Sequence, residues 1–129
     1  MPRDQRLGGD GDGRQRELLQ SPPRTRRSPL IALVFRYEAR DAGTFEAAYG
    51  PEGEWAQFFR QGRGYIGTEL LRDVEEPERY LVIDRWESAE AYNGFLDEHR
   101  DEYIRRADEA RFHYVQELRF GTFENVWTE

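Results

Sequence analysis

The stretch that decides the fold is residues 79–95, which read RYLVIDRWESAEAYNGF. Its first half is an apolar strand that ends at Trp86. Ser88 is a favourable N-cap, and the helix that follows it carries Tyr92 and Phe95 on one face. The stretch therefore predicts a strand that turns directly into a helix, with an aromatic side chain at the hinge.

The remaining elements follow from the same kind of pattern. The first helical segment begins at Asp41 or Thr44, is interrupted by the GPEG sequence at 50–53, and resumes at Trp55. After Ser88 we expect one long helix, followed by a short helix or turn over 112–118. Its apolar face would carry Tyr92, Phe95, Leu96, His99 and Tyr103. The predicted strands span residues 30–37, 65–73, 79–86 and 119–127.

The order of these elements is β-α-β-β-α-β, which predicts an α+β, ferredoxin-like fold with a four-stranded antiparallel sheet and both helices on one face. The first strand is apolar on both sides, with Leu33 on one face and Val34 on the other. The face without helices therefore needs a cover. A second copy of the same sheet is the simplest one, so we expect a homodimer through the sheet face.

Composition limits the classes of function. With 129 residues, the chain holds one domain, and without cysteine it has neither disulfides nor thiolate metal sites. Residues 29–129 carry twelve arginines against twenty-two acidic residues, a net charge of −10. Such a body repels phosphate backbones, so we expect no nucleic-acid partner.

Residues 1–28 differ in composition from the rest of the chain. They are rich in Arg, Gly and Pro, carry a net charge of +3, and predict a disordered leader before a domain at 29–129. Arg26 and Arg27 before the apolar run resemble an export signal, but that run ends at Arg36 and alternates like a strand. We therefore expect a cytoplasmic protein without a membrane partner.

Three segments carry a family resemblance: 49–59 (YGPEGEWAQFF), 64–71 (GYIGTELL) and 84–88 (DRWES), the last followed by Tyr92 and Phe95. Together they resemble the antibiotic biosynthesis monooxygenase domain of the dimeric α/β-barrel superfamily. The resemblance implies a dimeric α/β barrel with a ligand cavity between sheet and helices in each subunit. It also implies a monooxygenase that oxidises a phenolic or quinoid small molecule without flavin, metal or haem, so no cofactor is expected.

The resemblance also implies a set of site residues. Trp86 and Tyr92 match cavity-lining positions and are the candidate catalytic residues: Trp86 would donate its indole N–H to a ligand oxygen, and Tyr92 would donate or relay a proton. For both residues, packing in the core is the alternative role. The candidate residues for binding a small aromatic ligand are Tyr37, Phe35, Trp55, Tyr65, Phe95 and His99.

Two other functions stay open at this point. Val82 stands where some catalytic relatives carry an asparagine, which leaves a non-catalytic small-molecule-binding dimer as an alternative. A haem-binding or haem-degrading relative would need a histidine such as His99 on the second long helix, and an asparagine that the first strand lacks. His113 could act as a base near the cavity mouth or cap a helix end. The two histidines form no recognisable metal-ligand spacing.

Overall fold

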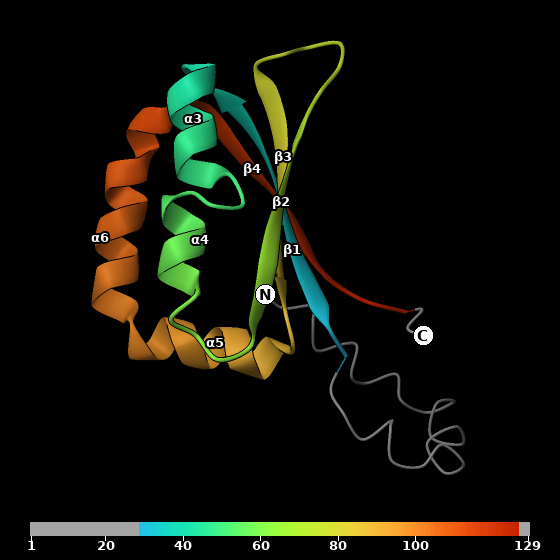
Figure 1. Ribbon diagram of the computed structural model, residues 1–129, viewed down its shortest axis with the longest axis vertical. Helices are drawn as coiled ribbons and strands as arrows, with labels where there is room; N and C mark the ends of the chain where they lie inside the picture. Colours follow the sequence, from blue (N-terminus) through green and yellow to red (C-terminus); the bar gives the residue numbers. More distant parts are fainter. Residues whose placement is uncertain (1–28, 127–129) are drawn as a thin grey trace.

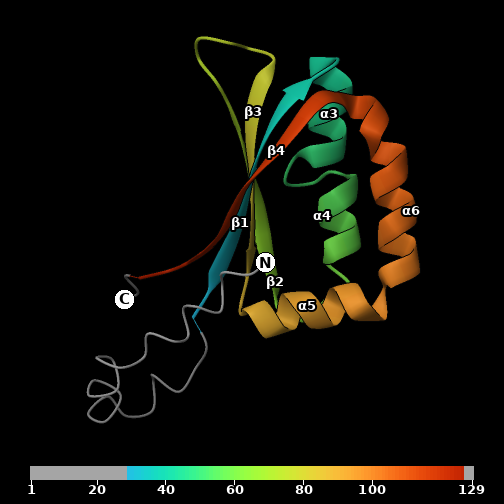
Figure 2. The ribbon, with the colours of Figure 1, turned by 180° about the vertical axis from the view of Figure 1, so that it is seen from behind.

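A computed structural model describes residues 29–126, so the predicted leader at 1–28 and Trp127 lie outside the described residues. The strands form one antiparallel sheet in the order β2-β3-β1-β4, and the helices lie together on one of its faces (Figures 1 and 2). This arrangement confirms the predicted ferredoxin-like α+β fold. The strands are β1 (Ile31–Ala39), β2 (Tyr65–Arg72), β3 (Arg79–Trp86) and β4 (Tyr114–Glu124). The helices are α3 (Ala42–Tyr49), α4 (Glu54–Phe59), α5 (Ala89–Glu98), α6 (Arg100–Ala110) and the 3₁₀ turn η2 (Arg111–His113).

The caps of α3 and α5 are those that the sequence predicts. The carboxylate of Asp41 accepts the backbone N–H of Thr44 at 3.0 Å, and the hydroxyl of Ser88 accepts that of Ala91 at 3.0 Å. Between α3 and α4, a Cβ atom at Gly53 would lie 2.6 Å from the carbonyl oxygen of Ala47. Only glycine allows this close approach, which splits the first helical segment in two.

The prediction of one long helix after Ser88 is wrong. The chain turns at His99 (φ −115°, ψ 29°), which ends α5 and begins α6, so the two helices meet in an L (Figure 1). No proline or glycine marks this point. The ring of His99 packs 4.4 Å from that of Phe95 and 6.0 Å from that of Phe58, so tertiary packing stabilises the turn.

The boundaries at the C-terminal end also differ from the prediction. The short helical turn covers only Arg111–His113, and β4 begins at Tyr114 rather than at residue 119. Pairing with the central strand β1 extends β4, because Tyr114 lies opposite Ala39 and Glu124 opposite Ile31. Pairing with β1 thus places the start of β4 before the predicted one.

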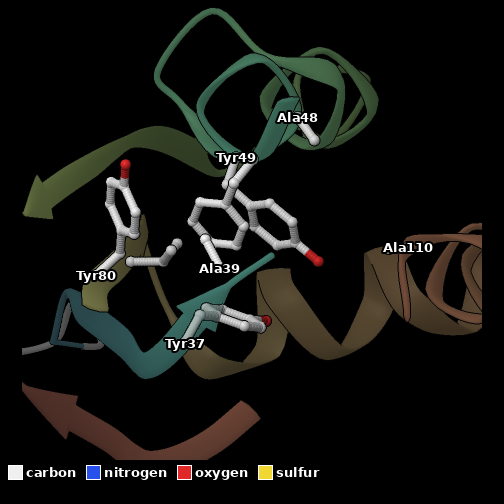
Figure 3. Close-up of a cluster of buried hydrophobic side chains, with 8 residues drawn as sticks. Tyr37, Ala39, Ala48, Tyr49, Tyr80 and Ala110 are labelled. Atoms are coloured by element: carbon white, nitrogen blue, oxygen red, sulfur yellow. The ribbon is translucent and has the colours of Figure 1, made fainter. Parts of the chain in front are cut away.

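Two clusters of buried side chains join the helices to the sheet. One cluster contains Tyr37, Tyr49 and Tyr80, and in Figure 3 the hydroxyl of Tyr80 points away from the hydroxyls of the other two. The second cluster contains Ile31, Leu33, Phe58, Phe59, Trp86 and Phe95. Phe35 and Trp55 pack against both clusters, so they lie where the two meet.

The opposite face of the sheet has no helix on it (Figures 1 and 2) and carries exposed apolar side chains beside the ion pair of Arg85 and Glu69. Leu71 pairs with Leu81 across β2 and β3, while Leu118 and Phe123 of β4 lie opposite Arg36 and Ala32 of β1. Leu71, Leu118 and Phe123 are each between 42% and 51% exposed. The cover that we expect for this face, a second copy of the chain, stays a prediction.

No helix among residues 29–126 is both long and apolar enough to cross a membrane. The cytoplasmic location expected from the sequence stays a prediction.

Candidate functional site

A cavity of about 160 Å³, here called the inner pocket, lies between the helix-covered face of the sheet and the helices. Aromatic rings make up most of its wall, and two carboxylates, Asp84 and Glu117, interrupt them. The remaining lining residues are Phe35, Tyr37, Tyr49, Trp55, Phe59, Val82, Tyr92, Tyr103, Ala107, Ala110 and Tyr114. The pocket is therefore suited to a flat, largely apolar ligand with polar substituents.

Asp84 is placed in the pocket by the alternation of β3. Val82, Asp84 and Trp86 share the helix-covered face, since successive side chains of a strand point to opposite sides. The hydroxyl of Thr68 donates to Oδ1 of Asp84 at 2.6 Å, and the hydroxyls of Tyr65 and Thr68 are 2.6 Å apart. These contacts orient the carboxylate. Thr68 bonds to Oδ1 and not to the second oxygen, Oδ2.

The electrostatics of Asp84 fit a proton acceptor. Loss of solvation raises the pKa of its carboxyl to about 6, and the hydrogen bond from Thr68 opposes that rise. At neutral pH the group is mostly ionised, yet its affinity for a proton is far above that of an ordinary aspartate. A carboxylate with these properties can take a proton from a bound ligand.

Glu117 belongs to a second polar group of the pocket. The hydroxyl of Tyr37 donates to its Oε2 at 2.7 Å, and that of Tyr114 donates to its Oε1 at 3.3 Å. Burial, together with the nearby carboxylate, raises the pKa of both tyrosines, so both hydroxyls stay protonated and donate. Hydrogen bonds from Tyr37 and Tyr114 thus orient the carboxylate of Glu117.

Tyr92 and Tyr103 stand on the helical side of the pocket. Burial raises the pKa of both hydroxyls, with Asp84 adding to the rise and Arg119 opposing it. Both side chains therefore keep their protons at neutral pH. They can donate a hydrogen bond to a ligand oxygen, but they are too weakly acidic to serve as bases.

The structure brings together four of the eight side chains that the sequence singled out. Phe35, Tyr37, Trp55 and Tyr92 line the inner pocket. The other four are Trp86, Tyr65, Phe95 and His99, which pack behind the lining residues.

Trp86 is fully buried, and its ring lies 5.4 Å from that of Tyr92 and 5.7 Å from that of Phe59. Its indole N–H meets no hydrogen-bond acceptor within the part of the chain that the structure describes. Trp86 thus supports the pocket from behind. Its catalytic role stays a prediction.

The sequence interpretation missed Asp84, Glu117 and Tyr103 as site residues. Asp84 had a signal, namely a single charge on the inner face of a strand, between Val82 and Trp86. Glu117 had none, because the predicted final strand began too late to place it on the sheet. Tyr103 was assigned only to the apolar face of a helix.

Neither histidine belongs to the lining of the inner pocket. The ring of His99 is stacked on aromatic side chains, and His113 lies edge-on to Tyr49 at 6.3 Å. Residues 29–126 contain no cluster of three or more side chains arranged to hold a metal ion. The wall of the inner pocket therefore contains no histidine.

The fold and the pocket define a class: ferredoxin-like α+β proteins with an aromatic cavity between sheet and helices. The family model for antibiotic biosynthesis monooxygenase matches residues 53–106, which run from the start of α4 into α6. The resemblance stated from the sequence is confirmed by this match.

The chain is similar in sequence to one kind of protein and in fold to another. Heme oxygenase (mycobilin-producing) from two strains of Mycobacterium tuberculosis is 38% identical over 56 residues, which cover 40% of this chain and 53% of that protein. The chain thus spans about half the length of the curated relatives it matches. The crystal structure of SnoaB, a cofactor-independent oxygenase from Streptomyces nogalater, superposes with a TM-score of 0.63 at 20% identity. That superposition covers 78% of this chain and 97% of SnoaB and supports the fold alone.

Proposed function

We propose that this chain is a cofactor-independent monooxygenase of the antibiotic biosynthesis type that acts on a phenolic or quinoid small molecule. The observation that carries the proposal is Asp84, a carboxylate with a pKa near 6 in the wall of a pocket otherwise built mainly from aromatic rings. The pocket offers a flat ligand a place to stack and a proton acceptor beside it. The family match supports the reaction class.

The proposed reaction begins with removal of a proton by Asp84 from the hydroxyl or activated CH₂ group of the substrate. The substrate anion then transfers an electron to dioxygen, and the two radicals combine to form a new carbon–oxygen bond. Asp84 returns its proton to the peroxide, and loss of water leaves a carbonyl group. One oxygen atom enters the product, the other leaves as water, and the substrate supplies all of the electrons.

The tyrosines have a separate role in this scheme. Tyr92 and Tyr103 keep their protons at neutral pH, so they can donate hydrogen bonds to the oxygen of the substrate anion as its charge develops. Phe35 and Trp55 provide apolar surface for the substrate ring and exclude water, which strengthens these hydrogen bonds.

We also propose that the working form is a homodimer through the face of the sheet that carries no helix. Leu71, Leu118 and Phe123 expose apolar surface there, on strands that also present Leu81 and Ile83. Two copies of this face would cover each other and would leave each inner pocket on the outer, helical side.

The proposal is tested by oxygen consumption with 1-naphthol and a naphthohydroquinone. We expect turnover by the wild type and loss of at least a hundredfold in Asp84→Asn, in keeping with the usual contribution of a general base of about 10² to 10⁴. Asp108→Asn is the matched control, since Asp108 is a surface residue paired with Arg111. Ligand binding without oxygen uptake across the panel would refute catalysis and leave a binding protein.

Haem binding is tested separately because of the similarity to a heme oxygenase. His99 packs against Phe95 rather than lining the pocket, so we expect no specific Soret band in a haemin titration. A saturable band that disappears in His99→Ala would instead favour the haem-binding alternative.

A further inference from the structure

A second hollow lies next to the inner pocket, where α5 meets α6. It has a volume of about 410 Å³, and we call it the elbow groove. Its lining residues are Asn93, Leu96, Asp97, Arg100, Tyr103 and Ile104. Tyr103 also lines the inner pocket, so it is the residue that the two linings share.

The position of Tyr103 follows from the turn at His99. Its backbone N–H bonds to the carbonyl of His99 at 2.9 Å, which fixes it in the first turn of α6. Its ring is partly buried and lies edge-on to Trp55 at 5.7 Å. Trp55 of α4 therefore holds the ring of Tyr103 at the inner pocket, and Tyr103 also lines the elbow groove.

The two volumes differ in what they can hold. The inner pocket, at about 160 Å³, is close to the roughly 150 Å³ of an apolar cavity that binds benzene. Sites for larger small molecules usually measure about 300–1,000 Å³. The inner pocket alone thus suits one ring or a compact pair of rings, whereas the groove, at about 410 Å³, lies within the larger range.

We infer that Tyr103 sets the size limit of the substrate, and that the elbow groove is the subsite for the additional rings of a larger one. With the ring of Tyr103 in place, the site takes one- and two-ring phenols. Loss of the ring joins the two hollows and admits three- and four-ring phenols. The inference rests on the proposed function for the choice of ligand class.

The chemistry of the groove fits such an extension. Leu96 and Ile104 offer apolar surface, and Ile104 is 56% exposed. Asn93 and the ion pair between Arg100 and Asp97, at 3.2 Å, provide polar groups for hydroxyl or carbonyl substituents. Polycyclic phenols carry their oxygen atoms at ring edges, and these side chains can form hydrogen bonds with such atoms.

The test measures dissociation constants with the full chain, from the quenching of tryptophan fluorescence by 1-naphthol, anthrone and a linear four-ring phenol. We expect Tyr103→Ala to bind the four-ring compound at least tenfold more tightly than the wild type, and 1-naphthol within threefold. Tyr103→Phe keeps the ring, so it should bind the four-ring compound no more tightly than the wild type does. Ile104→Ala alters the groove alone and should not produce the gain.

Equal affinity of the wild type for two and four rings would overturn the inference, as would the absence of a gain in a folded Tyr103→Ala. Tyr103→Leu, which retains apolar packing, replaces that variant if circular dichroism shows it unfolded. Failure of every compound to bind any variant also overturns it. Because binding is measured without turnover, failure of the monooxygenase proposal in the oxygen assay is a distinct result.

Discussion

Replacement of Asp84 by asparagine should change activity and stability in opposite directions. Asparagine has nearly the same shape, and its carbonyl can still accept the hydrogen bond that Thr68 donates at 2.6 Å. What the variant removes is the negative charge in the pocket wall. The variant therefore measures how much the charge of Asp84 lowers the stability of the fold, while the packing around the side chain stays the same.

The magnitude follows from the pKa of Asp84, which is raised from 3.8 to about 6 in the folded protein. Since the folded state binds the proton more tightly, stability is highest below pH 4 and falls as the pH rises through 6. Above that range, ionisation of Asp84 lowers the free energy of unfolding by about 3 kcal/mol in all, at roughly 1.36 kcal/mol for each unit of pKa. Between pH 5 and pH 8 the free energy of unfolding falls by about 1.4 kcal/mol.

The assay is urea denaturation of wild type and Asp84→Asn at pH 5 and pH 8. We expect the variant to be the more stable protein at both values, with a larger advantage at pH 8. In the oxygen assay the wild-type kcat/KM should rise with pH along a limb near pH 6, because only the ionised carboxylate accepts a proton. The variant should have low activity without that limb.

Two results would refute the reasoning. An Asp84→Asn protein no more stable than the wild type at pH 8 would mean that the carboxylate is well solvated. Wild-type activity without a limb near pH 6 would mean that another group accepts the proton. Asp108→Asn, which replaces a surface carboxylate, should change neither property.

Three further substitutions test the neighbouring parts of the structure. Thr68→Val removes the donor that stabilises the ionised form of Asp84, so the activity limb should move above pH 6, whereas Thr68→Ser should leave it in place. Trp86→Phe tests the predicted catalytic role. If Trp86 only packs, the free energy of unfolding falls by at most about 2 kcal/mol, because removal of an unpaired N–H offsets part of the cost of the cavity. Ligand affinity should then stay within threefold of the wild type. Leu118→Glu introduces a charge on the exposed sheet face and should convert a dimer to a monomer in light scattering; a wild-type monomer would contradict the proposed dimer.

Local sequence signals predicted most of the fold. The bounds of β3, the caps at Asp41 and Ser88, and the break at Gly53 depend on residues that are neighbours in the chain. The turn at His99 does not, because the apolar face continues through it from α5 into α6. Its cause is the packing of the ring against Phe95 and Phe58, and Phe58 lies on an element forty residues away.

The site was harder to predict for the same reason. Aromatic residues at strand or helix spacing look alike whether they line a cavity, as Trp55 and Tyr92 do, or fill a core, as Trp86 and Phe95 do. The difference depends on where the two buried clusters meet, and that is a property of the whole fold. Glu117 reaches the pocket because pairing with β1 extends β4 to Tyr114, before the predicted start at residue 119.

The energetics of Asp84 give the strongest argument that the pocket has a function. On the helix-covered face of β3, its neighbours Val82 and Trp86 are apolar, and an apolar side chain there would avoid a penalty of about 3 kcal/mol at neutral pH. The contact with Thr68 recovers only part of that cost, since the pKa stays raised. A packing role does not account for a carboxylate at this position, because packing would be better served without the charge. A role in accepting a proton does account for it, since the same loss of solvation that destabilises the fold brings the pKa close to neutrality.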